Sequence, residues 1–333
     1  MKCLYLDNVK SLHFEDKDIP VPEGKDVLIK IRARGICGTD LASYRSGVPM
    51  GFGHEMSGDI VKVGSASSWK EGTRVFVCNL SQKLTNYAPD QPNAYLGGFA
   101  EYILIHDPEK DVDLFELPEG MSYEEGALVE PFCVSMSGVK KAPVSETTKA
   151  VIFGAGIIGL GAALCLKHRG ATNITIADIN DIRLERAEQA GFNPLNTKDV
   201  SLMDELAKRY GMSISATKGQ VPDVDVYIDA AGVGALVQEA VTNARCMSQL
   251  TILAVHKNEV PLNLMNVMYN NLTVQGSLMY SLDDVKEAIT IINAHKDIAK
   301  TMISHALPFD EAVDAFETAD NPNVSIKVMM ISD

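Results

Sequence analysis

An apolar run that ends in a glycine-rich turn constrains the fold of this chain more than any other feature. Residues 150–153 are continuously apolar, and Gly154, Gly156 and Gly159 follow in the spacing GxGxxG. Residues 157–168 then have the pattern of a helix. An entirely apolar strand is typical of a parallel sheet that is covered on both faces. A glycine turn between such a strand and a helix predicts a dinucleotide-binding unit in a doubly wound α/β domain.

The glycines of this turn have separate physical roles. Gly154 permits the tight turn, Gly156 lets the backbone approach a pyrophosphate, and Gly159 lets the helix pack closely on the strand. The helix begins with Ile157 and Ile158, whose free N–H groups can bind phosphate oxygens. The alternative is that glycines in an apolar run serve packing alone, because the motif by itself is weak evidence.

A carboxylate follows the glycine turn at a characteristic distance. Asp178 ends the next predicted strand, 19 residues after Gly159. A carboxylate at this place binds ribose hydroxyls and repels a 2′-phosphate, so it favours NAD over NADP. The alternative role for Asp178 is a turn or capping residue before the helix predicted at residues 181–190. Arg183 could tolerate a phosphate, although its position is more typical of a solvated helix surface.

Strands and helices alternate from residue 150 onward, whereas short strands and many glycines dominate the first third of the chain. Predicted strands lie at residues 27–32, 59–63, 74–77, 102–105, 150–153, 174–177, 224–228, 250–255 and 272–274. Predicted helices lie at residues 157–168, 181–190 and 281–295, and residues 211–222 are expected to form a polar surface loop. This pattern predicts an α/β protein with a doubly wound parallel sheet and a separate β-rich unit.

Composition narrows the class of protein. The length of 333 residues suggests two domains, and a net charge of −14 argues against nucleic acid or an anionic membrane as a partner. Residues 1–20 lack the apolar segment of a signal peptide, and the longest uncharged run, residues 150–166, is too short and glycine-rich to span a membrane. Six scattered cysteines without a CxxC pair indicate reduced thiols. We therefore expect a cytoplasmic protein.

Dispersed residues before the glycine turn have side chains that suit zinc. Cys37 lies in the segment 35–40, His54 follows 17 residues later, and Glu130 precedes Pro131. A thiolate, an imidazole and a carboxylate are suitable zinc ligands, and three protein ligands leave the open position of a catalytic site. The alternatives are a buried small apolar Cys37, a structural His54 and a helix-start role for Glu130. Spacing alone does not decide between these readings.

Together, these segments resemble the medium-chain zinc-dependent dehydrogenase family, in particular its polyol and butanediol dehydrogenase branch. The matching segments, in chain order, are residues 35–40, 53–55, 97–102, 125–131, the glycine turn with Asp178, 276–280 and 326–328. The resemblance implies a GroES-like β-rich catalytic domain over residues 1–135, completed by residues 300–333. It also implies a NAD-binding Rossmann domain over residues 136–299.

The resemblance assigns roles to individual residues near the expected metal. Cys37 and His54 match zinc ligands, and Glu55 and Glu130 match two carboxylates that alternate as ligand or near-ligand. It implies one catalytic zinc per chain, without saying which glutamate binds at rest. Thr39 is expected to accept the proton of the substrate hydroxyl, although it could serve only as a turn residue. Two aromatic residues either line the substrate pocket or belong to the core, namely Tyr44 and Phe99.

This chain also departs from the family pattern. Cys78 stands alone where relatives often carry four cysteines around a structural zinc, so we expect no second zinc. Ala42 replaces a proton-relaying histidine, which redirects the proton through water or through Ser43. The segment between the first two candidate ligands is shorter than usual, which predicts a more open substrate mouth. Met279 replaces an arginine found in polyol dehydrogenases and is expected to border the substrate.

The resemblance implies a zinc-dependent oxidoreductase that transfers a hydride between a secondary alcohol and NAD. A short diol, a hydroxyketone or a small sugar alcohol is the expected substrate, and Arg45 is the nearby cation able to meet one phosphate or carboxylate oxygen. Residues 272–274, near the sheet edge, resemble the family's dimerisation region and predict a homodimer or homotetramer. Two alternatives are a zinc-independent quinone or enoyl reductase of the same fold and a catalytically silent NAD-binding protein.

Overall fold

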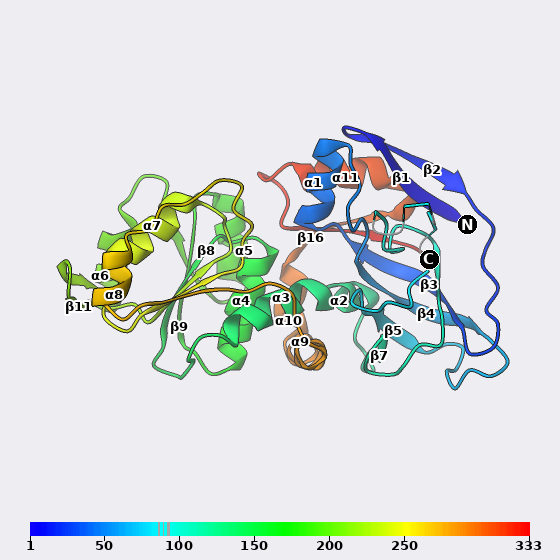
Figure 1. The fold of residues 1–333 in the computed structure, drawn as a ribbon, viewed down its shortest axis with the longest axis horizontal. Coiled ribbons are helices and arrows are strands. Elements are labelled where there is room, and N and C mark those ends of the chain that lie inside the picture. The colour runs from blue at the N-terminus through cyan, green and yellow to red at the C-terminus, as the bar shows by residue number, and fades with distance from the viewer. Residues whose placement is uncertain (86, 89, 92–93) are drawn as a thin grey trace. The chain divides into compact units, whose positions relative to one another are not determined.

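The chain forms two compact units, one of which is inserted into the other along the sequence. The computed structural model describes residues 1–85, 87–88, 90–91 and 94–333. Unit 1 comprises Met1–Glu130 and Ile292–Asp333, and unit 2 comprises Pro131–Ile291 (Figure 1). The divisions fall inside helices α3 (Val129–Val139) and α9 (Leu282–Ala294). The predicted domain ends at residues 135 and 299 lie inside α3 and inside α10 (Lys296–Thr301).

Unit 2 is built on a six-stranded parallel sheet in the order β10-β9-β8-β13-β14-β15. Its strands are β8 (Lys149–Phe153), β9 (Asn173–Asp178), β10 (Asn193–Asn196), β13 (Val226–Asp229), β14 (Gln249–Ile252) and β15 (Thr273–Gly276). Its further helices are α4 (Ile157–His168), α5 (Asp181–Gln189), α6 (Leu202–Tyr210), α7 (Gly234–Asn243) and α8 (Leu264–Tyr269). The strand order reverses between β8 and β13, so the predicted doubly wound sheet is confirmed.

The apolar pattern of unit 2 explains its layers. Strand β8 is buried from Ala150 to Phe153, as expected for a strand with helices on both faces. Helix α4 has the bounds predicted from the sequence, and residues 159–166 are all buried. Phe153, Tyr227 and Leu250 contribute to one core cluster with residues from α6 and α7. This packing holds the turn between β8 and α4 at the carboxyl end of the sheet.

The predicted loop at residues 211–222 is wrong. The segment forms an antiparallel hairpin of β11 (Met212–Ser215) and β12 (Gly219–Pro222). Buried Asn270 accepts hydrogen bonds from the Ala216 N–H at 2.6 Å and the Ser215 hydroxyl at 3.2 Å. Asn270 is more than 50 residues away in the sequence, so the local sequence of the short polar hairpin does not predict its structure.

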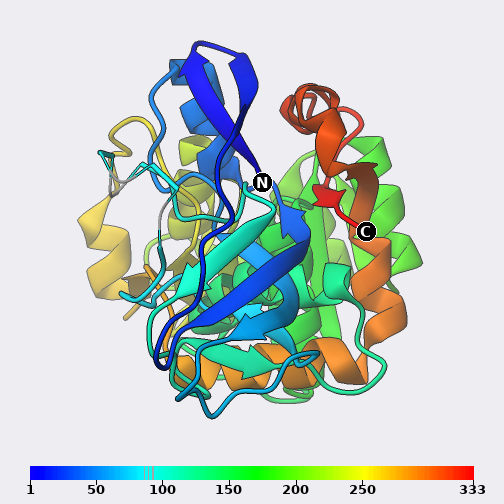
Figure 2. The ribbon, with the colours of Figure 1, turned by 90° about the vertical axis from the view of Figure 1, so that its right-hand side faces the viewer.

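Unit 1 is built on a seven-stranded sheet in the order β16-β17-β3-β4-β5-β7, with β6 also paired to β3. Its strands are β3 (Val27–Gly35), β4 (Glu55–Val63), β5 (Arg74–Val77), β6 (Tyr102–Ile105), β7 (Leu114–Glu116), β16 (Ile303–Pro308) and β17 (Lys327–Ile331). A separate hairpin pairs β1 (Lys2–Asn8) with β2 (Ser11–Asp16). Its further helices are α1 (Gly38–Ser46), α2 (Tyr123–Ala127) and α11 (Ala312–Asp320), with a 3-10 turn at Phe309–Glu311. The C-terminal strand β17 thus lies beside β3 (Figure 2).

Aromatic residues form much of the core beside this sheet. Phe99 packs edge-on against Phe52 and Phe316, with ring centroids 4.7 Å and 5.6 Å away. Tyr44 packs against Phe316 at 5.2 Å. Since Tyr44 is 2% exposed and Phe99 is fully buried, the structure favours their core role over a place in the substrate pocket. None of the helices in the described residues has the length and apolar character needed to cross a membrane.

Candidate active site

Two neighbouring strands bring the candidate metal ligands together. Cys37 follows β3 and is the N-cap residue of α1, whereas His54 directly precedes β4 and Glu55 is its first residue. Because β3 and β4 are antiparallel and Gly35 pairs with Glu55, the end of one strand faces the start of the other. Residues separated in sequence therefore meet at one edge of the sheet.

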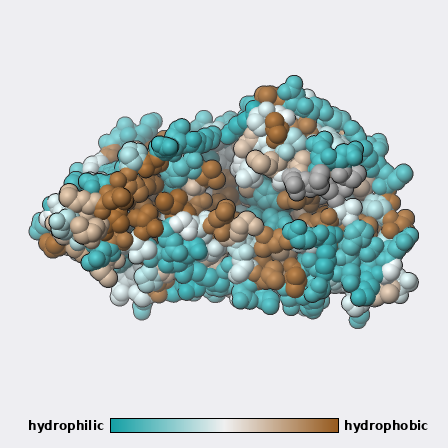
Figure 3. All heavy atoms as spheres, in the orientation of Figure 1, coloured by the Kyte–Doolittle hydropathy of each residue, from teal (hydrophilic) through white to brown (hydrophobic). Residues whose placement is uncertain are grey.

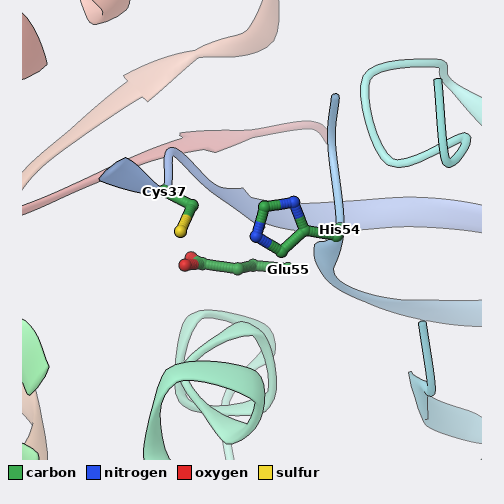
Figure 4. Close-up of side chains that lie close together, drawn as sticks. All are labelled: Cys37, His54 and Glu55. Atoms are coloured by element: carbon green, nitrogen blue, oxygen red, sulfur yellow. The ribbon is translucent and has the colours of Figure 1, made fainter. Parts of the chain in front are cut away.

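The three side chains converge on one point, as Figure 4 shows. One ligand atom from each of Cys37, His54 and Glu55 lies within 4.8 Å of the other two. Gly35 makes this convergence possible, since a Cβ built on it would lie 1.8 Å from Glu55 Oε2. A glycine of the sheet thus provides the space for a candidate ligand.

Asp40 joins the two ligand-bearing segments, a role that the sequence reasoning missed. Its fully buried carboxylate accepts hydrogen bonds from the backbone N–H of Cys37 at 2.8 Å and of Gly53 at 3.0 Å. Asp40 is the third residue of α1, where an acidic side chain commonly returns to the N-cap. That position was the available local signal.

The imidazole of His54 has a defined tautomer. Its Nδ1 lies 2.9 Å from the carbonyl oxygen of Gly51, which can only accept, so Nδ1 carries a proton, and in the neutral ring that binds a metal Nε2 keeps the lone pair. Burial by itself would lower the pKa of His54, but Asp40, Cys37 and Glu130 outweigh burial and raise the pKa well above 6.5. The acidic groups around His54 therefore favour a positive charge at this place.

Lys327 is a second residue that the sequence reasoning left without a role. Its Nζ donates to both carboxylate oxygens of Glu55 at 2.7 Å and to the carbonyl oxygen of Ile36 at 3.0 Å. Both side chains of the ion pair are at most 1% exposed. Since 272 residues separate Lys327 from Glu55, no local pattern could have linked them.

Glu130 interacts electrostatically with His54 and Glu55 but is not one of the three converging residues. It is the second residue of α3, and its Oε1 accepts a hydrogen bond from Asn79 at 3.4 Å. Burial is the main reason why the pKa of Glu130 is raised to about 7, with His54 acting against the shift and Glu55 adding to it. Glu55 and Glu130 thus remain two candidate carboxylates for one metal.

The turn between β8 and α4 has the geometry of a phosphate-binding loop. Gly154 has a φ of 97°, and a Cβ on Gly159 would lie 1.9 Å from the carbonyl oxygen of Gly154. A Cβ on Gly156 would meet nothing within 4 Å, so this backbone is open to approach. Ile157 and Ile158 form the first turn of α4 and are half-buried.

Asp178 lies at the end of β9, beside the glycine turn. Its Oδ2 accepts from the Ala155 N–H at 2.7 Å, and its Oδ1 accepts from the N–H groups of Ile179 and Asn180 at 2.7 Å and 3.0 Å. The carboxylate therefore holds the turn and the start of the next helix. Since two carboxylate oxygens offer about four acceptor sites, capacity for a ribose hydroxyl remains.

Comparison with known proteins identifies the family. The family model described as Alcohol dehydrogenase GroES-like domain matches residues 23–119, and that described as Zinc-binding dehydrogenase matches residues 158–294. Sorbitol dehydrogenase 1 of Saccharomyces cerevisiae is 30% identical over 95% of this chain and 93% of its own length. Probable D-xylulose reductase A of Aspergillus clavatus is 30% identical over 94% of this chain and 91% of its own length. The chain belongs to the zinc-binding dehydrogenase family.

A solved structure gives the same result for this dehydrogenase. The crystal structure of 2R,3R-butanediol dehydrogenase from Bacillus subtilis has a TM-score of 0.84 and 25% identity, covering 100% of this chain and 99% of that chain. The predicted GroES-like and Rossmann architecture is thereby confirmed, together with its oxidoreductase class. The alternatives of a zinc-independent reductase and a silent NAD-binding protein are not favoured.

The other residues predicted from the sequence do not belong to the cluster of Cys37, His54 and Glu55. Thr39 and Ala42 are exposed on α1, whereas buried Ser43 accepts a hydrogen bond from the Met50 N–H at 3.2 Å. Arg45 donates from Nε to Asp320 Oδ1 at 2.5 Å. In unit 2, Arg183 is the third residue of α5 and is half-buried, and Met279 is 56% exposed with a φ of 63°.

Proposed function

We propose that this dehydrogenase depends on zinc and NAD and transfers a hydride between the cofactor and a secondary alcohol of a small diol, polyol or sugar alcohol. The observation that carries the proposal is the convergence of Cys37, His54 and Glu55 within 4.8 Å. Soft sulfur, imidazole nitrogen and carboxylate oxygen form a donor set that suits zinc. Three protein donors leave room for the substrate hydroxyl.

The residues around this donor set fit one catalytic zinc. His54 offers Nε2 while Gly51 holds Nδ1, and Asp40 fixes the backbone on both sides of the site. When bound, zinc would lower the pKa of the substrate hydroxyl. Thr39 offers an exposed hydroxyl two residues after Cys37 for that proton. Glu130 is buried and interacts electrostatically with His54, and it is the alternative carboxylate ligand.

Unit 2 is proposed to bind NAD, and unit 1 to carry the catalytic residues. The open backbone at Gly156 and the free N–H groups of Ile157 and Ile158 support a pyrophosphate site. Asp178 supports NAD over NADP, because a negative 2′-phosphate would lie beside its carboxylate. Arg183 lies on the adjacent helix and is a candidate contact to the same ribose. The nicotinamide accepts or supplies the hydride, while the protein orients it.

The substrate is proposed to be uncharged. Arg45 is already paired with Asp320, so it has less capacity to bind a phosphate ester. The relatives named for sorbitol, D-xylulose and butanediol act on uncharged compounds with neighbouring hydroxyl or carbonyl groups. Met279, an apolar exposed side chain, supports a short chain over a long polyol as substrate.

Catalytic efficiency with a panel of alcohols tests this function. NADH formation should be measured with a four-carbon diol, its mono-alcohol, a six-carbon polyol and the phosphate ester of that polyol. The diol should exceed the mono-alcohol, chelation should abolish turnover, and zinc should restore it. A preference for the phosphate ester that Arg45→Ala removes would contradict the substrate class. Full turnover after complete zinc removal would contradict the metal.

We also propose that the enzyme is a homodimer or homotetramer assembled through unit 2. Strand β15 is the edge of the six-stranded sheet, and nearby α8 exposes Leu264, Met268 and Tyr269 by 71%, 62% and 55%. Figure 3 shows apolar residues gathered around this part of unit 2. An open strand edge beside apolar side chains suits pairing with a second copy. A monomer by light scattering at assay concentration would contradict this assembly.

A further inference from the structure

A buried carboxylate lies where the order of the parallel strands reverses. Asp229 ends β13 and pairs in register with Phe153, the last residue of the neighbouring β8. The next N–H, of Ala230, donates to the Phe153 carbonyl oxygen at 2.9 Å. A Cβ on Gly154 would lie 3.1 Å from the Ala230 carbonyl oxygen. Asp229 is therefore next to the glycine turn, at the edge of the sheet where ligands of such folds bind.

The carboxylate of Asp229 holds two segments together. Its Oδ1 accepts from the N–H groups of Ala231 and Gly232 at 3.1 Å and 3.0 Å, in the turn after β13. Its Oδ2 lies 2.6 Å from Nε2 of His256, in the segment after β14. Asp229 is fully buried. One carboxylate thus fixes both the local turn and the ring of a distant histidine.

This contact leaves one ring nitrogen of His256 for recognition. Since the carboxylate of Asp229 accepts, Nε2 donates, and in the neutral ring Nδ1 is a hydrogen-bond acceptor. The side chain of His256 is 17% exposed, and the only hydrogen bond described for its ring in residues 1–85, 87–88, 90–91 and 94–333 is the one to Asp229. Segment 253–254 is also fixed, because the N–H groups of Leu253 and Ala254 donate to the Asp229 carbonyl oxygen at 2.9 Å and 3.0 Å.

The path of a bound dinucleotide leads to this histidine. With a ribose at Asp178 after β9 and the pyrophosphate at the turn after β8, the remaining half continues over β13 and β14. That half carries amide and hydroxyl donors. We propose that His256, positioned by Asp229, accepts a hydrogen bond from the carboxamide N–H of the nicotinamide ring of the cofactor. The proposal rests on the NAD dependence proposed above and adds a residue that selects and orients the reactive half.

The binding of two ligands, NADH and ADP-ribose, distinguishes a contact between His256 and the nicotinamide from a general effect on the fold. NADH contains the nicotinamide half, whereas ADP-ribose contains the adenosine, pyrophosphate and second ribose without the nicotinamide ring. Their dissociation constants should be measured with the zinc-loaded enzyme, by NADH fluorescence and by competition. His256→Ala should weaken NADH by about tenfold, the equivalent of one hydrogen bond, and ADP-ribose by less than NADH. His256→Gln, which keeps an acceptor oxygen, should recover part of the loss.

Two further variants complete the test. His106→Ala removes a histidine that pairs with Asp26 in unit 1 at 3.2 Å, and it should leave both ligands at wild-type affinity. Asp229→Asn should raise KM for NAD more than it lowers kcat, because the asparagine oxygen can still accept from Ala231 and Gly232 while the carboxylate that orients His256 is lost. Wild-type NADH affinity in His256→Ala, or equal losses for both ligands, would overturn the proposal. If the wild-type enzyme binds neither ligand, the proposed NAD dependence fails, and this inference fails with it.

Discussion

Lys327 and Glu55 form a buried ion pair between strands β17 and β4, with Nζ 2.7 Å from each carboxylate oxygen. The same carboxylate converges with Cys37 and His54. Glu55 therefore lies beside both a fixed cation and a candidate metal position. A buried carboxylate needs such compensation, because desolvation of an unpaired charge is strongly unfavourable.

The first prediction concerns a variant that lacks the ammonium group of Lys327. Lys327→Met should lower the stability of the metal-free protein by about 3–5 kcal/mol, because Glu55 is left buried without its partner. Zinc supplies positive charge at the same carboxylate, so the zinc-loaded variant should lose less. Thermal unfolding with and without chelator measures the difference, and Lys327→Arg is the charge-preserving control. Equal losses in both states would show that zinc does not compensate Glu55.

A second prediction separates the metal from the cofactor. Cys37→Ala should reduce bound zinc from about one per chain to trace amounts and abolish turnover, since a three-ligand site loses its sulfur donor. NADH affinity should stay within about twofold of wild type, because the glycine turn lies in unit 2. Elemental analysis and NADH fluorescence measure the two properties. Cys246→Ala, the same change in unit 2, should retain both zinc and turnover. Two tightly bound zinc ions per wild-type chain would contradict the proposed stoichiometry.

A third prediction concerns the choice of cofactor. Asp178→Asn removes the negative charge but keeps an oxygen that can accept from the Ala155 N–H. Efficiency with NAD should fall by roughly tenfold to a hundredfold, through weaker bonds to the ribose hydroxyls, while efficiency with NADP should rise. Asp178→Ala also releases the glycine turn and should lower both. Equal efficiency of the wild type with NAD and NADP would refute this role of Asp178.

The glycine turn allows binding to be separated from folding. Gly156→Ala places a Cβ in open space, so the thermal midpoint should hardly change while NADH affinity falls, because the pyrophosphate approaches this backbone. Gly159→Ala places a Cβ 1.9 Å from a carbonyl oxygen, so it should lower the thermal midpoint itself. If Gly156→Ala bound NADH like wild type, the pyrophosphate would not contact this part of the turn.

A last prediction concerns how the stabilising effect of Asp284 depends on pH. Burial by itself would raise the pKa of Asp284, but hydrogen bonds from Lys140 and Ser281 outweigh burial and hold the pKa below 3.8. A lowered pKa in the folded state stabilises the protein above the unfolded pKa, and this contribution is lost as pH falls through the folded pKa. Asp284→Asn should therefore destabilise the protein at pH 7 by about 1 kcal/mol, since the bonds from Ser281 and Lys140 lose their charged acceptor, and the difference should shrink in acid. Urea unfolding across pH measures it, with exposed Asp283→Asn as control.

Local sequence patterns are sufficient for the elements that make local contacts. Helix α4 could be predicted at both ends because glycine precedes it and apolar residues continue through it. Cys37 and His54 could be proposed from residue type and motif, since both segments are short and continuous. The same reasoning reached Asp178, which follows its strand directly.

Long-range contacts account for what could not be predicted. Lys327, His256 and the anchor of the hairpin at residues 212–222 each act on a partner far away in the chain. Asp40 differs, because its bonds to Cys37 and Gly53 span only three and 13 residues, and a capping pattern indicated one of them. Tyr44 and Phe99 were ambiguous because an aromatic residue has the same local pattern in a core and in a pocket.

Strand β17 also sets an order of events during synthesis. Cys37, His54 and Glu55 are synthesised before unit 2, whereas Lys327 and β17, the strand that pairs with β3, are synthesised after it. Unit 2 is contiguous and can fold while unit 1 still lacks that strand. A chain truncated before β17 would retain the fold of unit 2. It would expose the edge of β3 and leave Glu55 without the ammonium group of Lys327. The complete cluster of Cys37, His54, Glu55 and Lys327 therefore requires chain segments from both sides of unit 2.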